Sequence, residues 1–300
     1  MKSSFLFLVV LSLTTCAAFA QTKTTTISKT KVAEEKPAFQ KFYDRLKVSY
    51  WASYQSSSIG QWDYRALDEK GKKYDDYAHN MFNQISFNYN FGWKMNFVVN
   101  PRWTTNLGST SKYPKGSGAA TGLFVIEDML VGFQGTLYSS QDGKFNYWTR
   151  MGGRLPTSSA SRNSNITIQP EIFSIPSYDF NKKWQLGAYV QLRHWVYEQK
   201  FTGRRYRIFT APYLQYTIND TTKFTVFYEN YTQNKDSMSQ TGKSPNFKAA
   251  WNNAMIAIGK DVTPKWNIMP FIGYMVDASH VQQRPLDPMW FGFWTSYQIK

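Results

Sequence analysis

Residues 83–92 read NQISFNYNFG, a stretch in which large apolar and uncharged polar side chains alternate. In an extended chain, successive side chains point to opposite faces. One face then carries four large apolar groups: Ile85, Phe87, Tyr89 and Phe91. The other face carries uncharged polar groups, among them Ser86, Asn88 and Asn90. This stretch therefore predicts a β-strand that separates an apolar environment from a polar one.

The same period-two alternation begins at Leu46 and continues to the end of the chain. It recurs in about twelve segments of roughly ten residues each, the length that a tilted strand needs to cross a membrane. These segments are 46–54, 83–92, 95–107, 128–138, 144–155, 165–175, 184–196, 205–218, 223–232, 249–259, 266–276 and 290–299.

The connections between these segments alternate in length. Those around 56–79, 106–126 and 233–249 are long, whereas others, such as SSQDGK (139–144) and NDTT (219–222), are short. Short turns at one end and longer loops at the other are typical of an up-and-down barrel. A Greek-key sandwich needs long crossovers in fewer places, so the alternation favours the up-and-down arrangement.

The composition is rich in aromatic residues yet hydrophilic on average. Of 300 residues, 18% are aromatic and 18% are charged, and the mean hydropathy is −0.49. No stretch after the amino-terminal segment approaches the roughly 18 apolar residues of a transmembrane helix. Two classes of protein stay compatible with this composition, namely a soluble secreted β-protein and a membrane β-barrel, in which outward and inward residues average out.

The placement of tryptophan favours the barrel. Trp184 and Trp266 each begin a segment directly after a short turn, and Trp103, Trp195 and Trp290 lie near the ends that lead to longer loops. Indole rings at both ends of the strands are expected at the two membrane interfaces. Tryptophans in the core of a sandwich would lie in the middle of the strands instead.

The amino-terminal residues indicate export. Lys2 is followed by an apolar run and then by the small-residue pattern Ala18-Phe19-Ala20, which is typical of a cleaved secretory signal peptide over residues 1–20. Residues 21–45 are polar and rich in lysine and threonine, and we expect them to form a flexible periplasmic leader. The only cysteine, at position 16, lies in the segment expected to be removed.

These features together resemble the bacterial outer-membrane β-barrel proteins of the porin-like class. The resemblance covers most of residues 46–300 and rests on no specific family motif. It implies an all-β fold: a closed up-and-down antiparallel transmembrane β-barrel of about 12 strands, with short periplasmic turns and longer extracellular loops. It also implies a place in the Gram-negative outer membrane, with lipid as a partner and no nucleic acid. The oligomeric state stays open.

Charged side chains fall at the alternate positions, which point into the barrel because an arginine on the lipid face costs roughly 2–4 kcal/mol. Eight of them are candidate lumen and selectivity residues: Arg102, Arg150, Arg154, Arg193, Arg207, Asp128, Glu171 and Glu229. In one interpretation, the arginines line a narrow pore that favours anions, with Glu171 and Glu229 orienting them. In the other, the arginines pair with Glu171, Glu229 and Asp128 and plug the lumen.

Signals for catalysis are weak. The chain contains no G-x-S-x-G, no H-E-x-x-H and no phosphate-binding loop, and its histidines (His79, His194 and His280) show no metal-ligand spacing. We therefore expect no enzyme, no metal and no cofactor. The expected function is passive diffusion of small hydrophilic solutes, with anion preference as a finer expectation. The alternatives are a non-conducting barrel that acts in adhesion or surface structure through its loops and, less favoured, an outer-membrane enzyme.

Overall fold

The computed structural model describes residues 37–58, 80–92, 94–106, 124–198, 205–234, 247–276 and 289–300. Two helices lie in this part of the chain, α2 (Ala38–Arg45) and α3 (Ser159–Asn163). The strands are β1 (Leu46–Ser58), β2 (Asn80–Tyr89), β3 (Met95–Asn100), β4 (Arg102–Asn106), β5 (Phe124–Ile126), β6 (Met129–Ser139), β7 (Phe145–Leu155), β8 (Ile166–Asp179), β9 (Trp184–His194), β10 (Val196–Tyr197), β11 (Tyr206–Asn219), β12 (Thr222–Asn234), β13 (Phe247–Thr263), β14 (Trp266–Met275) and β15 (Met289–Gln298).

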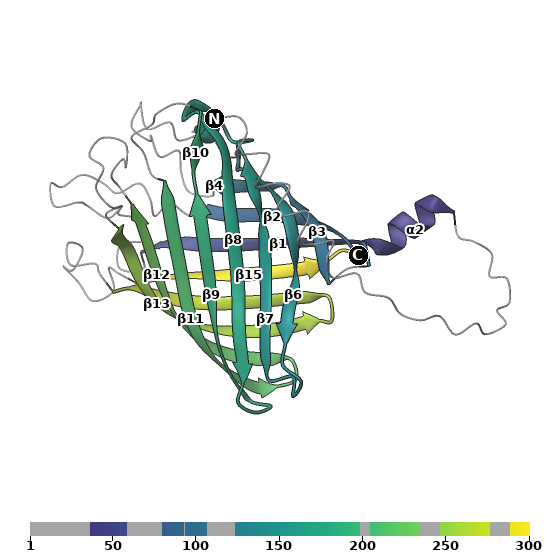
Figure 1. Ribbon diagram of the computed structural model, residues 1–300. Coiled ribbons are helices and arrows are strands. Elements are labelled where there is room, and N and C mark those ends of the chain that lie inside the picture. The colour runs from purple at the N-terminus through teal and green to yellow at the C-terminus, as the bar shows by residue number, and fades with distance from the viewer. Residues whose placement is uncertain are drawn as a thin grey trace. The chain divides into compact units, whose positions relative to one another are not determined.

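In the described residues, these strands form one closed antiparallel barrel with twelve staves, where a stave is one strand, or two strands in line, that runs from one end of the barrel wall to the other. Three staves consist of two strands each: β3 with β4, β5 with β6, and β9 with β10. The first of these breaks falls at Pro101, whose nitrogen has no hydrogen to donate to a sheet. The ring closes because β1 pairs with both β2 and β15. Figure 1 shows the front staves, among them β7, β8 and β9, crossing the rear staves β1, β13 and β15. The sequence-based prediction of about twelve up-and-down strands is confirmed.

The outer face of the barrel carries the apolar residues that the alternation predicts. Phe87, Ile172 and Ile256 are exposed, and each belongs to the predicted outward set of its strand. Along the ladder, Ile172 lies opposite Met151 on one side and Leu192 on the other, so outward residues of neighbouring staves form apolar rows. Each described stave pairs with a neighbour on both sides, which provides hydrogen-bond partners for the backbone within the wall, as a sheet in a lipid bilayer requires.

Asn83, the first residue of the opening stretch, is a polar exception on this face. Its side chain is 3% exposed and accepts a hydrogen bond of 2.6 Å from the Tyr50 hydroxyl. Its amide nitrogen donates to the carbonyl oxygen of Met81 at 2.8 Å and to the hydroxyl of Thr105 at 3.3 Å. Local partners therefore satisfy this amide on an otherwise apolar surface.

The tight turns all lie at one end of the staves. Between β6 and β7, Gly143 has a φ of 69°, which lies in the left-handed region that glycine adopts readily. The Asp142 carboxylate accepts hydrogen bonds from the Ser140 hydroxyl and the Lys144 backbone N–H, which lower the pKa of Asp142. At the other end, most of the predicted long loops lie outside the described residues, and the β7–β8 connection contains α3.

Residues 1–36, with the predicted signal peptide and most of the predicted leader, lie outside the described part of the chain. Residues 38–45, at the end of that leader, form α2. The Phe42 ring stacks on Tyr89 with a centroid distance of 5.0 Å, and the Arg45 carbonyl accepts the Asn90 N–H at 3.1 Å. Among the described residues, no helix is both long and apolar enough to cross a membrane.

Candidate functional site: the barrel interior

The inner face of β9 passes three successive layers of side chains. Gln185 lies near the turn end, Tyr189 in the middle and Arg193 toward the loop end. The exposed Leu186 and Leu192 alternate with them on the outer face. The neighbouring staves add further side chains at these three levels. From the turn end to the loop end, we call the levels the basic mouth, the aromatic layer and the arginine cluster.

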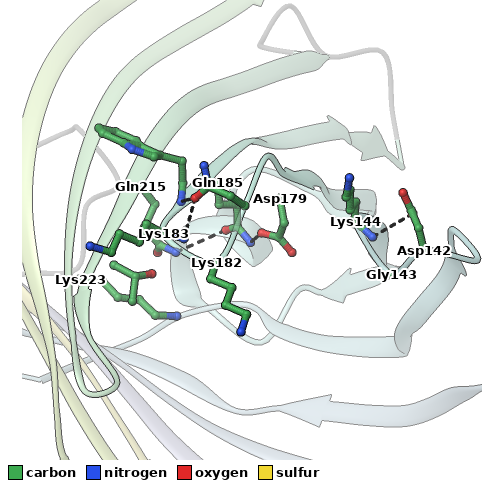
Figure 2. A pocket seen from close by; sticks show the side chains of 12 residues that line it. Asp142, Gly143, Lys144, Asp179, Lys182, Lys183, Gln185, Gln215 and Lys223 are labelled. Carbon is green, nitrogen blue, oxygen red and sulfur yellow. Dashed lines mark hydrogen bonds between the residues drawn. The ribbon is translucent and has the colours of Figure 1, made fainter.

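The basic mouth is a cavity of about 540 Å³ at the turn end of the barrel. Its lining includes four lysines and two aspartates: Lys144, Lys182, Lys183, Lys223, Asp142 and Asp179. Figure 2 shows Gln185, Gln215 and Lys223 on one side of the cavity, and Asp142 and Lys144 on the other. The lysines outnumber the aspartates by two, so this entrance attracts anions.

Hydrogen bonds connect the basic mouth to the layer above it. The Gln185 amide donates to Asp179 at 2.8 Å, and its carbonyl oxygen accepts the Tyr213 hydroxyl at 3.1 Å. The Tyr213 ring lies over Gly187, where an added Cβ would come within 2.4 Å of it. A side chain at position 187 would therefore displace this ring.

The aromatic layer consists of eight rings on the inner wall: Trp148, Phe173, Tyr189, Tyr213, Phe227, Phe271, Trp290 and Trp294. They form a continuous series of contacts from β7 to β15, with centroid distances between 4.6 and 6.2 Å. Tyr213, Phe227, Phe271 and Trp290 are buried, whereas the other four keep part of their surface exposed. This layer thus narrows the lumen and presents apolar surface to it.

The arginine cluster surrounds one carboxylate. Glu171 forms ion pairs with Arg150 at 3.1 Å, Arg154 at 2.7 Å and Arg193 at 2.9 Å. The Glu171 side chain is fully covered, while those of the three arginines keep 10–14% of their surface exposed. The net charge of these four groups is +2, and the exposed surface of the cluster belongs to the arginine side chains rather than to the carboxylate.

A glycine lies at the level of this carboxylate. Gly152 is directly opposite Glu171 in the ladder, between Arg150 and Arg154 on the same face of β7. A Cβ at Gly152 would come within 2.2 Å of the Val131 carbonyl oxygen on the adjacent stave. The close approach of the β6 backbone therefore leaves no space for a side chain at position 152.

Two further predicted arginines lie on the inner wall. The Arg102 side chain is buried and donates to Gln84 at 2.9 Å, with Phe82 at 5.9 Å from its guanidinium carbon. Arg207 lies opposite Arg193 in the ladder, and its guanidinium carbon is 4.2 Å from the centre of the Tyr231 ring. Both add positive charge near the arginine cluster.

The two other predicted acids differ from Glu171. Glu229 accepts a hydrogen bond of 3.3 Å from the Asn253 amide, and no ion pair with a described arginine is found for it. The interpretation of a plugged lumen pairs Asp128 with arginine, but Asp128 accepts hydrogen bonds from the Ser158 backbone N–H at 3.0 Å and from the side chains of Ser161 and Gln169. It therefore fixes the beginning of α3, since Ser158 is the cap of that helix.

Tryptophan placement is confirmed only in part. Trp184 and Trp266 are about equally exposed, at 41% and 40%, and lie on the outer face at the turn end. Trp195 and Trp290 were expected at the outer rim, but both are buried, Trp290 against Phe271 inside the barrel. The alternation of side chains could not reveal the aromatic layer. Its rings alternate with apolar residues of the outer face, so neither face of these strands is polar.

No site for a metal ion is found among the described residues, in that no group of three histidine, cysteine, aspartate or glutamate side chains converges there. His79 and His280 lie outside this part of the chain. His194 is within it, and its Nδ1 lies 2.9 Å from the Arg205 carbonyl oxygen.

Solved structures with the same barrel fold are porins and channels. An outer-membrane channel from Pseudomonas putida F1 has a TM-score of 0.54 at 8% identity, covering 84% of this chain and 94% of that one. The NanC porin gives 0.47 at 12%, covering 84% and 99%, and the OmpF of Salmonella typhi gives 0.39 at 9%, covering 84% and 97%. No protein-family model matches the chain, and a search of curated proteins finds no match. The chain therefore shares its β-barrel fold with the outer-membrane channel of Pseudomonas putida F1.

Proposed function

We propose that this chain is an outer-membrane channel through which small hydrophilic solutes diffuse, with a preference for anions. One observation carries the proposal: Glu171 is fully covered, whereas the side chains of Arg150, Arg154 and Arg193 keep 10–14% of their surface exposed. A ring of uncompensated guanidinium groups in a narrow pore attracts anions and repels cations. The basic mouth extends the same sign of charge to the turn end.

The test is single-channel recording of the refolded protein in a planar bilayer under a gradient of potassium chloride. The reversal potential should have the sign of a chloride-preferring pore. The double variant Arg150→Gln, Arg193→Gln should move it toward zero, since glutamine keeps a donor for Glu171 but carries no charge. Arg162→Gln removes an exposed arginine from α3 and is the matched control. A cation-preferring pore would contradict the proposal.

A second function is favoured by a different observation. Phe227 and Trp294 contact each other although their staves are not neighbours, so rings reach across part of the interior. A barrel closed by such contacts would not conduct and would act through its loops, in adhesion or surface structure. A silent bilayer, with insertion verified by protease protection, would support this alternative.

A further inference from the structure

We propose that the interior recognises aromatic carboxylates, which deepens the function proposed above and rests on it. The reason is that two rows of side chains, the aromatic layer and the arginine cluster, adjoin on β7 and β8, while on β9 Gln191 separates Tyr189 from Arg193. A solute that matches both rows needs a flat apolar body and one negative group.

The two rows adjoin on the inner faces of β7 and β8. Trp148 lies two residues before Arg150 on β7, and Phe173 lies two residues after Glu171 on β8. Two residues along a strand span about 7 Å. That separation is close to the length of a benzoate ion, from ring edge to carboxylate, so one such ion can reach both rows.

The rows meet at Arg150. Its guanidinium carbon lies 5.2 Å from the centre of the Phe173 ring, and the two residues are direct partners in the ladder. Phe173 continues the aromatic row in both directions, toward Trp148 and Tyr189, with centroid distances of 6.1 Å to each. A second flat ring resting on this row would leave its carboxylate level with the guanidinium groups.

The arginines retain donors for a second carboxylate. A guanidinium group has five N–H donors. Glu171 accepts one hydrogen bond from Arg150, one from Arg154 and one from the Nε of Arg193, whose terminal nitrogen also lies 2.9 Å from it. The remaining donors, together with the net charge of +2, suit an incoming anion.

The partly exposed rings favour an anion that carries an apolar body. Trp148, Phe173 and Tyr189 keep part of their surface exposed to the lumen. A polyhydroxylated anion of the same charge would leave that apolar surface in contact with water, whereas an aromatic body would cover it. Offset or edge-to-face contact with one of these rings is worth about a threefold to tenfold gain in affinity.

The test compares two anions of equal charge as blockers of the chloride current through the refolded full-length protein. Benzoate is the aromatic probe and gluconate the hydrophilic one. Benzoate should reach half-block at a concentration about tenfold lower than gluconate. Phe173→Leu should reduce this advantage to about twofold, because leucine fills the space without providing a ring. Phe133→Leu, the same change on the outer face of β6, is the control and should leave the advantage intact.

The outcomes separate this inference from the function on which it rests. If benzoate and gluconate block the chloride current equally, the aromatic-carboxylate inference is overturned, but the proposed channel function still stands. A silent bilayer would overturn the channel, and calorimetric titration of the inserted protein with benzoate would then decide the inference. Benzoate binding that Phe173→Leu weakens would support it, and an absence of binding heat at millimolar benzoate would overturn it.

Discussion

Phe227 and Trp294 meet edge to face inside the barrel, with ring centroids 5.4 Å apart and planes at 90°, although two staves, β13 and β14, separate their strands. Neighbouring staves lie about 4.8 Å apart, so this contact spans three such spacings along the curved wall. Ala257 of β13, which is 1% exposed, belongs to the same buried cluster as Phe227, and Trp294 packs against this cluster. The pair therefore narrows the lumen on this side.

Truncating this pair is expected to widen the lumen. Trp294→Ala should raise the single-channel conductance by about twofold, since it removes a ring that occupies the interior. Phe293→Ala changes the adjacent residue of the same strand, whose side chain lies on the outer face against Tyr54. The control should conduct as the unmodified chain does, and equal conductance in all three proteins would show that the aromatic layer does not limit flow.

Asp128 is expected to hold the loop end rather than to set selectivity. Asp128→Ala removes the acceptor for the Ser158 N–H and for the Ser161 hydroxyl, so the turn that begins α3 loses its anchor. Trypsin should then cut after the exposed Arg162 at least several times faster, as judged by gel electrophoresis. The reversal potential in a salt gradient should not change. A large shift in reversal potential at an unchanged cleavage rate would instead show that Asp128 contributes to the ion selectivity of the lumen.

The alternation of side chains was sufficient to predict the wall of the barrel. Because the side-chain period of a strand is two, placing Phe87 or Ile172 on the outer face fixes the direction of every other residue in that stave. The same parity correctly placed Arg150, Arg193 and Glu171 inside, where they come together. The face on which each of these side chains lies depends only on the local sequence and on the cost of placing a charge in apolar surroundings.

The contacts inside the barrel could not be predicted in the same way. Parity says that Asp128 and Glu171 both point inward, but only the register between staves decides that Glu171 meets three arginines and Asp128 meets serines. Trp290 illustrates a second limit. Its position near a loop suggested the outer rim, yet its parity matches that of Trp294, and both rings contact Phe271 inside.

Two glycines on the inner wall are expected to differ sharply in their tolerance of a methyl group. Gly152→Ala places a Cβ within 2.2 Å of the Val131 carbonyl oxygen, a backbone atom that can move only with its stave. The expected loss of stability is about 2 kcal/mol, which urea unfolding in phospholipid vesicles would measure. Gly259→Ala is the control, because its nearest neighbour is the flexible Met269 side chain at 3.7 Å. Its stability should change by less than about 0.5 kcal/mol.

Removing the Glu171 carboxylate is expected to destabilise the barrel more than removing that of the half-buried Glu229. Glu171→Gln leaves Arg150, Arg154 and Arg193 without their shared counter-ion, and breaking such a pair from one side costs roughly 3–5 kcal/mol. The lower end of this range is expected, because the three arginine side chains keep 10–14% of their surface exposed and water relieves part of the repulsion.

Glu229→Gln is the matched control for this change. The bond that Glu229 accepts comes from the Asn253 amide, and a glutamine oxygen can accept it equally well. Urea unfolding followed by tryptophan fluorescence should therefore show a loss for Glu171→Gln at least twice that for Glu229→Gln. Equal losses would mean that burial of a carboxylate, rather than its three arginine partners, determines the stability of this layer. In that case Glu171 would not hold the arginines in place, and their exposure to the lumen would need another cause.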